Sequence, residues 1–207
     1  MKIGLLGGGN FGNQLAEILT SAGHDVQVGL RDQRRAPAAA TYRLGALAEA
    51  ADHGEVVVIA VPYSSCEEVL TPLLPQLHGK IVVDATNPLN DDWSPRWLGQ
   101  QNSAAEEVAR LLAGTRLVKA FNTIFADAMK VAPPAGESRA LTAFIAGNDE
   151  QANQVVAQLA RDTGFSPVVT GALTNARYLE AMANLNIQIA VVHGGGTNAG
   201  FLYRQNL

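Results

Sequence analysis

Three glycines near the start of the chain have the spacing of a phosphate-binding turn. Gly7, Gly9 and Gly12 form the pattern G-x-G-x-x-G directly after the apolar segment 2–6. In such a turn the first glycine permits a tight bend, the second lets a pyrophosphate approach the backbone, and the third lets the next helix pack closely. The start of that helix also offers unpaired N–H groups to an anion. The candidate residues of this turn are Gly7, Gly8, Gly9, Asn10, Phe11 and Gly12.

Basic side chains follow the second expected strand, 25–30. A site for NAD carries Asp or Glu at this strand end, where the carboxylate binds the ribose hydroxyls. This chain has Arg31, Arg34 and Arg35 there instead. Guanidinium groups match phosphate oxygens in a fork geometry, which favours the 2′-phosphate of NADP, with Arg31 as the main candidate. Asp32 leaves a second interpretation open, in which its carboxylate folds back onto a ribose.

Three later strand ends also carry residues suited to ligand binding. Val61-Pro62-Tyr63, Asn87 and Asn122 follow the expected strands 56–60, 80–84 and 116–120, respectively. Ligands of parallel sheets bind beyond the carboxyl ends of the strands. We expect the backbone at Val61 and the amides of Asn87 and Asn122 to fix the nicotinamide ribose and carboxamide, with Tyr63 in the pocket wall. Ordinary packing of Tyr63 and an Asn-Pro turn at Asn87 are the alternatives.

Strands alternate with helices along the whole chain, which predicts an α/β fold. We expect a Rossmann-like, doubly wound, mainly parallel sheet with helices on both faces and a C-terminal helical extension. Residues 1–207 then form a single domain, in which 174–207 cover the acceptor site or a dimer contact. Further strands are expected at 141–146 and 166–170, and helices at 44–51, 64–74, 103–112, 149–163 and 174–192. Ser103 and Glu106 predict a capping box at the start of the helix 103–112. A loop is expected at 130–140.

Composition restricts the class of protein. The chain has 207 residues, 47% of them hydrophobic and 16% charged, which suits one domain with a sizeable core. A net charge of −4 disfavours nucleic-acid binding. No signal-peptide pattern is visible, no apolar run reaches roughly 18 to 20 residues, and the single cysteine, Cys66, cannot form an intrachain disulfide. We therefore expect a cytoplasmic protein that binds small molecules and does not enter a membrane.

No catalytic side chain and no metal ligand set is predicted. The four histidines are scattered at positions 24, 53, 78 and 193, without metal-binding spacing. His193 and Lys119 are candidates for a role at the site, but a helix-terminal cation and a core-flanking charge are the simpler interpretations. Hydride transfer between two bound cofactors needs positioning more than acid–base residues.

Taken together, these motifs identify a family. The chain resembles the NADPH-dependent coenzyme F420 reductases and their bacterial relatives, and also the cytosolic reductase domain of six-transmembrane metalloreductases. The resemblance spans nearly the whole chain and rests on segments 2–12, 28–31, 59–62, 83–88, 119–123 and 175–180.

The resemblance implies several roles. It implies that NADP is held by Gly8 to Phe11, by Arg31 with a basic residue near Arg35, by Tyr63 and by Leu89. It also implies that the final helix and tail help to form the acceptor pocket and a homodimer contact. Leu30 and Asn122 depart from the archaeal F420 enzymes, which carry Ser and His there, so NADP is better supported than F420.

We therefore expect an NADP-dependent oxidoreductase that transfers a hydride between NADPH and either F420 or a flavin, FMN or FAD. One alternative is reduction of a small imine or carbonyl compound, since pyrroline-carboxylate reductases share the glycine turn. Another is a non-catalytic NADP sensor or partner-binding module, which the missing acid–base residue favours. The physiological acceptor and the direction of transfer stay open.

Overall fold

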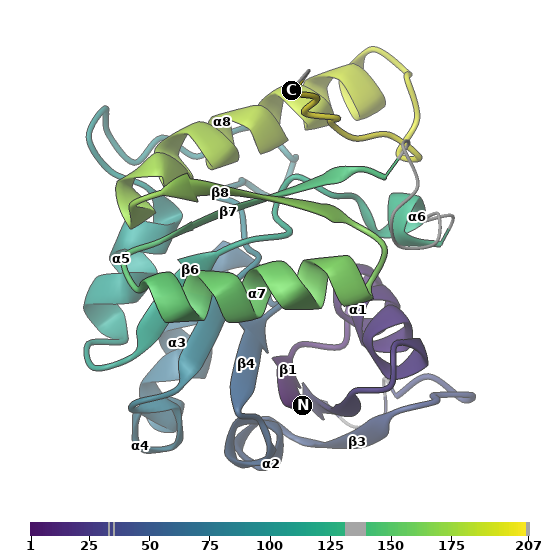
Figure 1. Ribbon diagram of the computed structural model, residues 1–207, viewed down its shortest axis with the longest axis vertical. Coiled ribbons are helices and arrows are strands. Elements are labelled where there is room, and N and C mark those ends of the chain that lie inside the picture. The colour runs from purple at the N-terminus through teal and green to yellow at the C-terminus, as the bar shows by residue number, and fades with distance from the viewer. Residues whose placement is uncertain (33, 35, 131–139, 206–207) are drawn as a thin grey trace.

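A computed structural model of the chain describes residues 1–32, 34, 36–130 and 140–205 (Figure 1). Arg35 and nearly all of the expected loop 130–140 lie outside these residues. Among the helices of the described chain, none combines the length and the apolar character needed to cross a bilayer.

Within the described residues, the strands form one sheet in the order β3-β2-β1-β4-β5-β6-β7-β8. Neighbouring strands are parallel, except that β7 runs antiparallel to β6. From β1 the chain adds β2 and β3 on one side, and it then returns so that β4 pairs with the other side of β1. The topological switch point therefore lies between β1 and β4. The strands are β1 (Lys2–Leu6), β2 (Asp25–Leu30), β3 (Arg43–Ala46), β4 (Val56–Ile59), β5 (Ile81–Asp84), β6 (Arg116–Lys119), β7 (Thr142–Gly147) and β8 (Ser166–Gly171).

Helices cover both faces of this sheet, as predicted. One apolar cluster joins α1 and α7 to one face, and a second joins α2, α3 and α5 to the other. Figure 1 shows α7 and α1 in front of the sheet and α8 along its β7–β8 end. The helices are α1 (Asn10–Ser21), α2 (Leu47–His53), α3 (Cys66–Leu70), α4 (Leu74–Leu77), α5 (Ala104–Leu111), α6 (Ala126–Met129), α7 (Glu150–Asp162) and α8 (Ala176–Ile187).

The central strands are apolar along their length because both faces are covered. All four residues of β4, Val-Val-Val-Ile, are buried. Burying each such side chain contributes roughly 1.5–3 kcal/mol, so these strands are a main source of stability. The continuous apolar run at 56–60 predicted this arrangement, which is typical of parallel sheets.

Two expected helices differ from the prediction. The segment 44–51 begins as β3, whose pairing with the edge of β2 overrides its local helical pattern, and only α2 is helical. The helix expected at 64–74 is divided into short helical turns, with α3 ending before Pro72 and α4 carrying Pro75. Proline cannot donate a backbone hydrogen bond within a helix, which explains the interruptions.

The C-terminal part packs back onto the domain. A π-helical segment, Gln188–Val192, continues α8, so the predicted helix 174–192 is largely present but not uniform. The tail then returns to β7, where Thr142 N donates to Phe201 O at 2.8 Å and Tyr203 N donates to Thr142 Oγ1 at 2.8 Å. The last helix, α8, lies against the sheet, where Leu179 packs with Phe144 and Ala146 of β7.

The contact between β1 and α2 requires glycine at position 4. A Cβ atom on Gly4 would lie 1.9 Å from the backbone oxygen of Ala50. We expect Gly4→Ala to lower the free energy of unfolding by roughly 1–3 kcal/mol, because strand and helix must move apart. Gly9→Ala is the control, since a Cβ there meets nothing within 4 Å. Urea unfolding of both variants measures the difference, and equal midpoints would contradict the prediction.

Candidate functional site

A cleft of about 660 Å³ opens at the carboxyl ends of β1, β4, β5 and β6, next to the switch point. Residues of α6, α8 and the π-helical segment form its opposite wall. The structure brings together most of the candidate residues identified from the sequence. Those lining this cleft are Gly9, Asn10, Phe11, Val61, Pro62, Tyr63, Asn87, Leu89 and Asn122.

The glycine turn has the shape that the motif predicts. Gly7 has a φ of +117°, and a Cβ there would lie 2.6 Å from Ala60 O. A Cβ on Gly12 would lie 2.0 Å from Gly7 O. These two glycines are therefore required by the fold itself. Gly9 differs, because it faces open space and begins α1 without a side-chain cap.

This open helix start fits a phosphate group. The first N–H groups of a helix have no partner within the helix, and the positive end of the dipole lies there. The first turn of α1 carries no acidic residue that would repel an anion. A side chain at Gly9 would meet no part of the protein, so the free volume is available to a ligand.

Two residues that sequence reasoning missed support the turn. Asn13 Nδ2 donates to Gly8 O at 3.0 Å, and Tyr42 Oη donates to Asn13 Oδ1 at 3.0 Å. Burial raises the pKa of Tyr42, so its hydroxyl remains a donor. A polar residue in the first turn of the helix was the available signal for Asn13. Nothing in the local sequence pointed to Tyr42.

Arg31 and Arg34, which follow β2, lie on the surface. The Arg31 side chain is 58% exposed, and its Nη1 lies 3.6 Å from Glu68 Oε1. Asp32 accepts two hydrogen bonds from the Arg34 guanidinium, at 2.9 and 3.0 Å. This contact turns Asp32 toward Arg34, which weakens the interpretation of Asp32 as a ribose ligand. Arg35 is outside the described residues.

The two candidate asparagines, Asn87 and Asn122, are joined by hydrogen bonds. Asn87 Nδ2 donates to Asn122 O at 2.8 Å, and Asn122 Nδ2 donates to Asn87 Oδ1 at 2.9 Å. Asn122 Nδ2 also donates to Leu179 O at 3.1 Å on α8. The Oδ1 atom of Asn122 is buried in the described structure without a hydrogen-bond partner. This acceptor, in a residue that lines the cleft, suits a ligand N–H such as that of a carboxamide.

Tyr63 is held by neighbours on its outer side. Its hydroxyl donates to Glu107, and the Arg96 guanidinium lies 5.8 Å from the centre of its ring. Burial, followed by the hydrogen bond and charge of Glu107, raises the pKa of Tyr63 well above its ordinary value. Tyr63 therefore acts as a fixed wall of the cleft and does not ionise near neutral pH.

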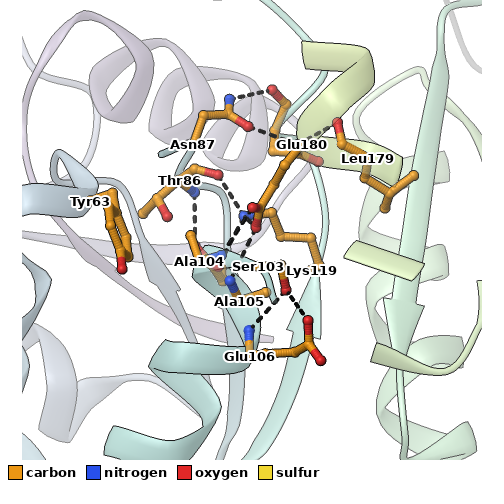
Figure 2. Close-up of polar contacts among 12 residues, drawn as sticks. Tyr63, Thr86, Asn87, Ser103, Ala104, Ala105, Glu106, Lys119, Leu179 and Glu180 are labelled. Atoms are coloured by element: carbon orange, nitrogen blue, oxygen red, sulfur yellow. Dashed lines mark hydrogen bonds and ion pairs between the residues drawn. The ribbon is translucent and has the colours of Figure 1, made fainter. Parts of the chain in front are cut away.

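A buried cluster of charged side chains lies directly beneath the polar residues of the cleft (Figure 2). Lys119 Nζ lies 3.0 Å from Asp84 Oδ2 and 3.0 Å from Glu180 Oε1, and it donates to Thr86 O at 2.6 Å. The Lys119 side chain is fully buried. Burial by itself would lower the pKa of Lys119, but the two carboxylates outweigh this effect and raise it.

The second carboxylate of the cluster also holds α5. Glu180 accepts hydrogen bonds from Ala104 N at 2.9 Å and from Ala105 N at 3.1 Å, at the helix start. Ser103 caps the same helix, as predicted, by accepting from Glu106 N at 3.2 Å. The cluster has two carboxylates and one lysine, so one negative charge is not neutralised by the lysine. The dipole of α5 and these N–H donors stabilise that charge. The cluster therefore links β5, β6, α5 and α8.

The cluster fixes the backbone that borders the cleft. Asp84 Oδ1 accepts from Thr86 N at 2.8 Å, while Lys119 binds Thr86 O, so both backbone groups of this residue are held. Asn87 follows at once. Figure 2 shows Asn87 just above this network, on the side away from α5. The charged residues thus position the polar residues that face a ligand.

Some reactive candidates are excluded from direct chemistry. Lys119 is enclosed on all sides, so it supports the site and does not touch a ligand. Cys66 is buried and packs in the apolar cluster of α3, and burial raises the pKa of its thiol to about 12. His193 lies after the π-helical segment and is not among the described residues of the cleft wall.

Comparison with known proteins agrees with this geometry. Residues 2–88 match the family model described as "NADP oxidoreductase coenzyme F420-dependent". The F420-dependent NADP reductase of Methanothermobacter marburgensis is 33% identical over 94% of this chain and 96% of its own length. The chain belongs to the F420-dependent NADP reductase family. This confirms the family resemblance and, with it, the prediction of an NADP-dependent oxidoreductase with a Rossmann-like fold.

Two further relatives define the range of the likeness. A structure of a candidate F420-dependent NADP-reductase from Arthrobacter sp. FB24 has a TM-score of 0.85 and 30% identity, covering 99% of this chain and 100% of that one. The metalloreductase STEAP3 of Rattus norvegicus is 36% identical over 87% of this chain. This chain spans only 36% of that protein's length. The metalloreductase likeness therefore concerns one part of a larger protein.

Removing the buried lysine leaves two carboxylates facing each other without a cation. We expect Lys119→Met to lower the free energy of unfolding by about 3–5 kcal/mol. Lys130→Met is the matched control, because Lys130 is half-exposed and pairs with Asp127 at the surface, so a change below about 1 kcal/mol is expected. Urea unfolding followed by circular dichroism measures both. Similar losses in the two variants would show that the cluster does not stabilise the fold.

Proposed function

We propose that the cleft binds NADP(H) together with a deazaflavin or flavin, so that a hydride passes from one to the other. When the acceptor is reduced, NADPH would supply the hydride and F420, FMN or FAD would accept it together with a proton from solvent; the reverse reaction would return both. The observation that carries this proposal is a single cleft that joins an open helix start to an unpartnered acceptor atom on Asn122.

Each part of the cofactor has a matching group on the protein. The helix start at Gly9 to Phe11 would bind the pyrophosphate. Arg31 would bind the 2′-phosphate, since its side chain is exposed and its existing contact with Glu68 is long. The free Oδ1 of Asn122 would accept a hydrogen bond from the carboxamide, and the locked Asn87–Asn122 pair would hold that acceptor in place. Val61, Pro62, Tyr63 and Leu89 would form the apolar sides.

The rest of the cleft suits a flat, apolar ring system. Leu89, Ile187 and Val191 line it together with Phe125. Asp91 and Asp127 are the carboxylates of the described lining, and Asp127 is already bonded to Lys130 and Thr197. Hydrogen bonds from these partners lower the pKa of Asp127, so it is a poor proton donor. The apolar walls of the cleft favour a large flat ring over a small imine or carbonyl compound as the hydride acceptor.

The other expectations stay predictions. A homodimer would cover the exposed apolar side chains at the C-terminal end, which include Tyr178, Leu185, Ile189 and Val192. A cytoplasmic location and a flavin in place of F420 are likewise predictions. Titration with NADPH and candidate acceptors tests the reaction and distinguishes F420 from a flavin.

Purified protein is titrated with NADPH, and F420 and then FMN are added to the same sample. We expect NADPH-dependent loss of the F420 or FMN absorbance, because the proposed site would hold both rings in one cleft. Tight NADPH binding without reduction of F420, FMN or a flavin-coupled ferric chelate would contradict the enzyme and support the sensor. Turnover with cyclic imines or keto acids alone would favour the small-substrate alternative.

The role of Arg31 is tested by cofactor preference. Arg31→Ala should weaken NADPH binding by about 1.5–3 kcal/mol, roughly ten- to 150-fold, because charge-assisted hydrogen bonds to the 2′-phosphate are lost. NADH, which lacks that phosphate, should bind almost unchanged. Glu68→Gln removes the present partner of Arg31 and should keep the NADPH preference. Calorimetric titration measures the dissociation constants, and an unchanged preference in Arg31→Ala would assign selectivity to another residue.

A further inference from the structure

An exposed tryptophan lies in the wall of the cleft. Trp93 is 57% exposed and lines the same cavity as Leu89, Asn122 and Val191. The chain has two tryptophans, and the other, Trp97, is 77% exposed and is not among the described residues of the cavity wall. A large ring left in contact with water at a binding site has much apolar surface that a ligand can cover.

The backbone at Trp93 adopts a conformation that large side chains rarely take. Its φ is +68°, in the left-handed region normally used by Gly or Asn. Such outliers persist where the surrounding structure holds them, and they gather at ligand-binding sites. The unusual φ therefore calls for an explanation in the segment that carries Trp93.

That segment is held by its own hydrogen bonds. Trp93 N donates to Asn90 O at 3.0 Å, and Asn90 N donates to Ser94 O at 2.9 Å. The Asn90 side chain donates to Ser94 Oγ at 2.9 Å, and a β-bridge joins Leu89 to Pro95. The ring thus projects from a closed turn, which limits the entropy lost when a ligand binds to it.

The protein itself provides no stacking partner for this ring in the described residues. The ring pairs found there are Phe121 with Phe165 and Phe144 with Tyr203, and the cation over a ring is Arg96 on Tyr63. A stacking surface in a cleft without an internal partner is available for an external flat molecule.

We propose that Trp93 stacks on the ring system of the electron acceptor and selects for flat, tricyclic acceptors. This proposal rests on the proposed function, because it concerns the second molecule in the same cleft. The pyrophosphate and 2′-phosphate sites lie at Gly9 to Phe11 and Arg31, and the carboxamide acceptor is on Asn122. Trp93, on the segment after Leu89, offers an exposed aromatic surface that these cofactor contacts leave unused.

The test uses the fluorescence of the acceptor itself, in protein without NADPH. FMN and F420 are excited at wavelengths longer than those that tryptophan absorbs. Loss of their fluorescence on binding therefore reports contact with an electron-rich ring. The control variant Trp97→Ala should quench FMN fluorescence as strongly as the unchanged protein does. Trp93→Ala should lose most of the quenching and bind FMN about tenfold more weakly. Trp93→Phe should recover most of the affinity without the quenching.

NADPH binding separates the possible failures. Trp93→Ala should bind NADPH within about twofold of the unchanged protein, which also shows that the variant is folded. Equal quenching and equal affinity for FMN in Trp93→Ala and Trp97→Ala would overturn the proposal. So would a Trp93→Ala variant that loses affinity for NADPH alone. If Trp93-dependent binding of FMN or F420 occurs but no hydride passes, the stacking role stands and the proposed reaction fails.

Discussion

The ammonium group of Lys119 needs oxygen atoms around it, because a buried cation without partners costs several kcal/mol. Those oxygens come from Asp84 at the end of β5, from the backbone at Thr86 and from Glu180 on α8. The sheet, the segment after β5 and the last helix must therefore meet at one point.

The order of the cleft follows from this constraint. The charges that fix Thr86 lie below the surface, and the uncharged residues Asn87 and Asn122 line the cleft. The Lys119 cluster is thus kept out of contact with a ligand, while hydrogen-bonding groups and apolar walls border the cleft. Such an arrangement suits a reaction in which two rings must be aligned and little proton transfer is asked of the protein.

Features that depend on residues close together in the sequence could be predicted from it. The glycine turn, the apolar run of β4 and the Ser103 cap each depend on neighbouring residues, and all were predicted. The edge strand β3 was missed because its pairing with β2 outweighs a helical local pattern. The prolines at 72 and 75 gave a signal for the broken helix that the prediction did not use.

Contacts between distant segments were beyond reach of pattern reasoning. Asp84 and Lys119 are opposite charges at the ends of two buried strands, so their pairing had a signal, but the contribution of Glu180 depends on how α8 docks. The hydrogen bonds between Asn87 and Asn122 likewise require the exact separation of β5 and β6 ends. The φ of Trp93 follows from a turn whose geometry no local motif specifies.

The position of Glu180 has a consequence for how the protein is made. Ala104 and Ala105 begin α5, yet the carboxylate that binds their N–H groups is translated much later. A nascent chain that has emerged only as far as β6 carries Lys119 with one of its two carboxylates and α5 with part of its cap. The Lys119 cluster and the α5 cap are therefore complete only after α8 has left the ribosome and docked.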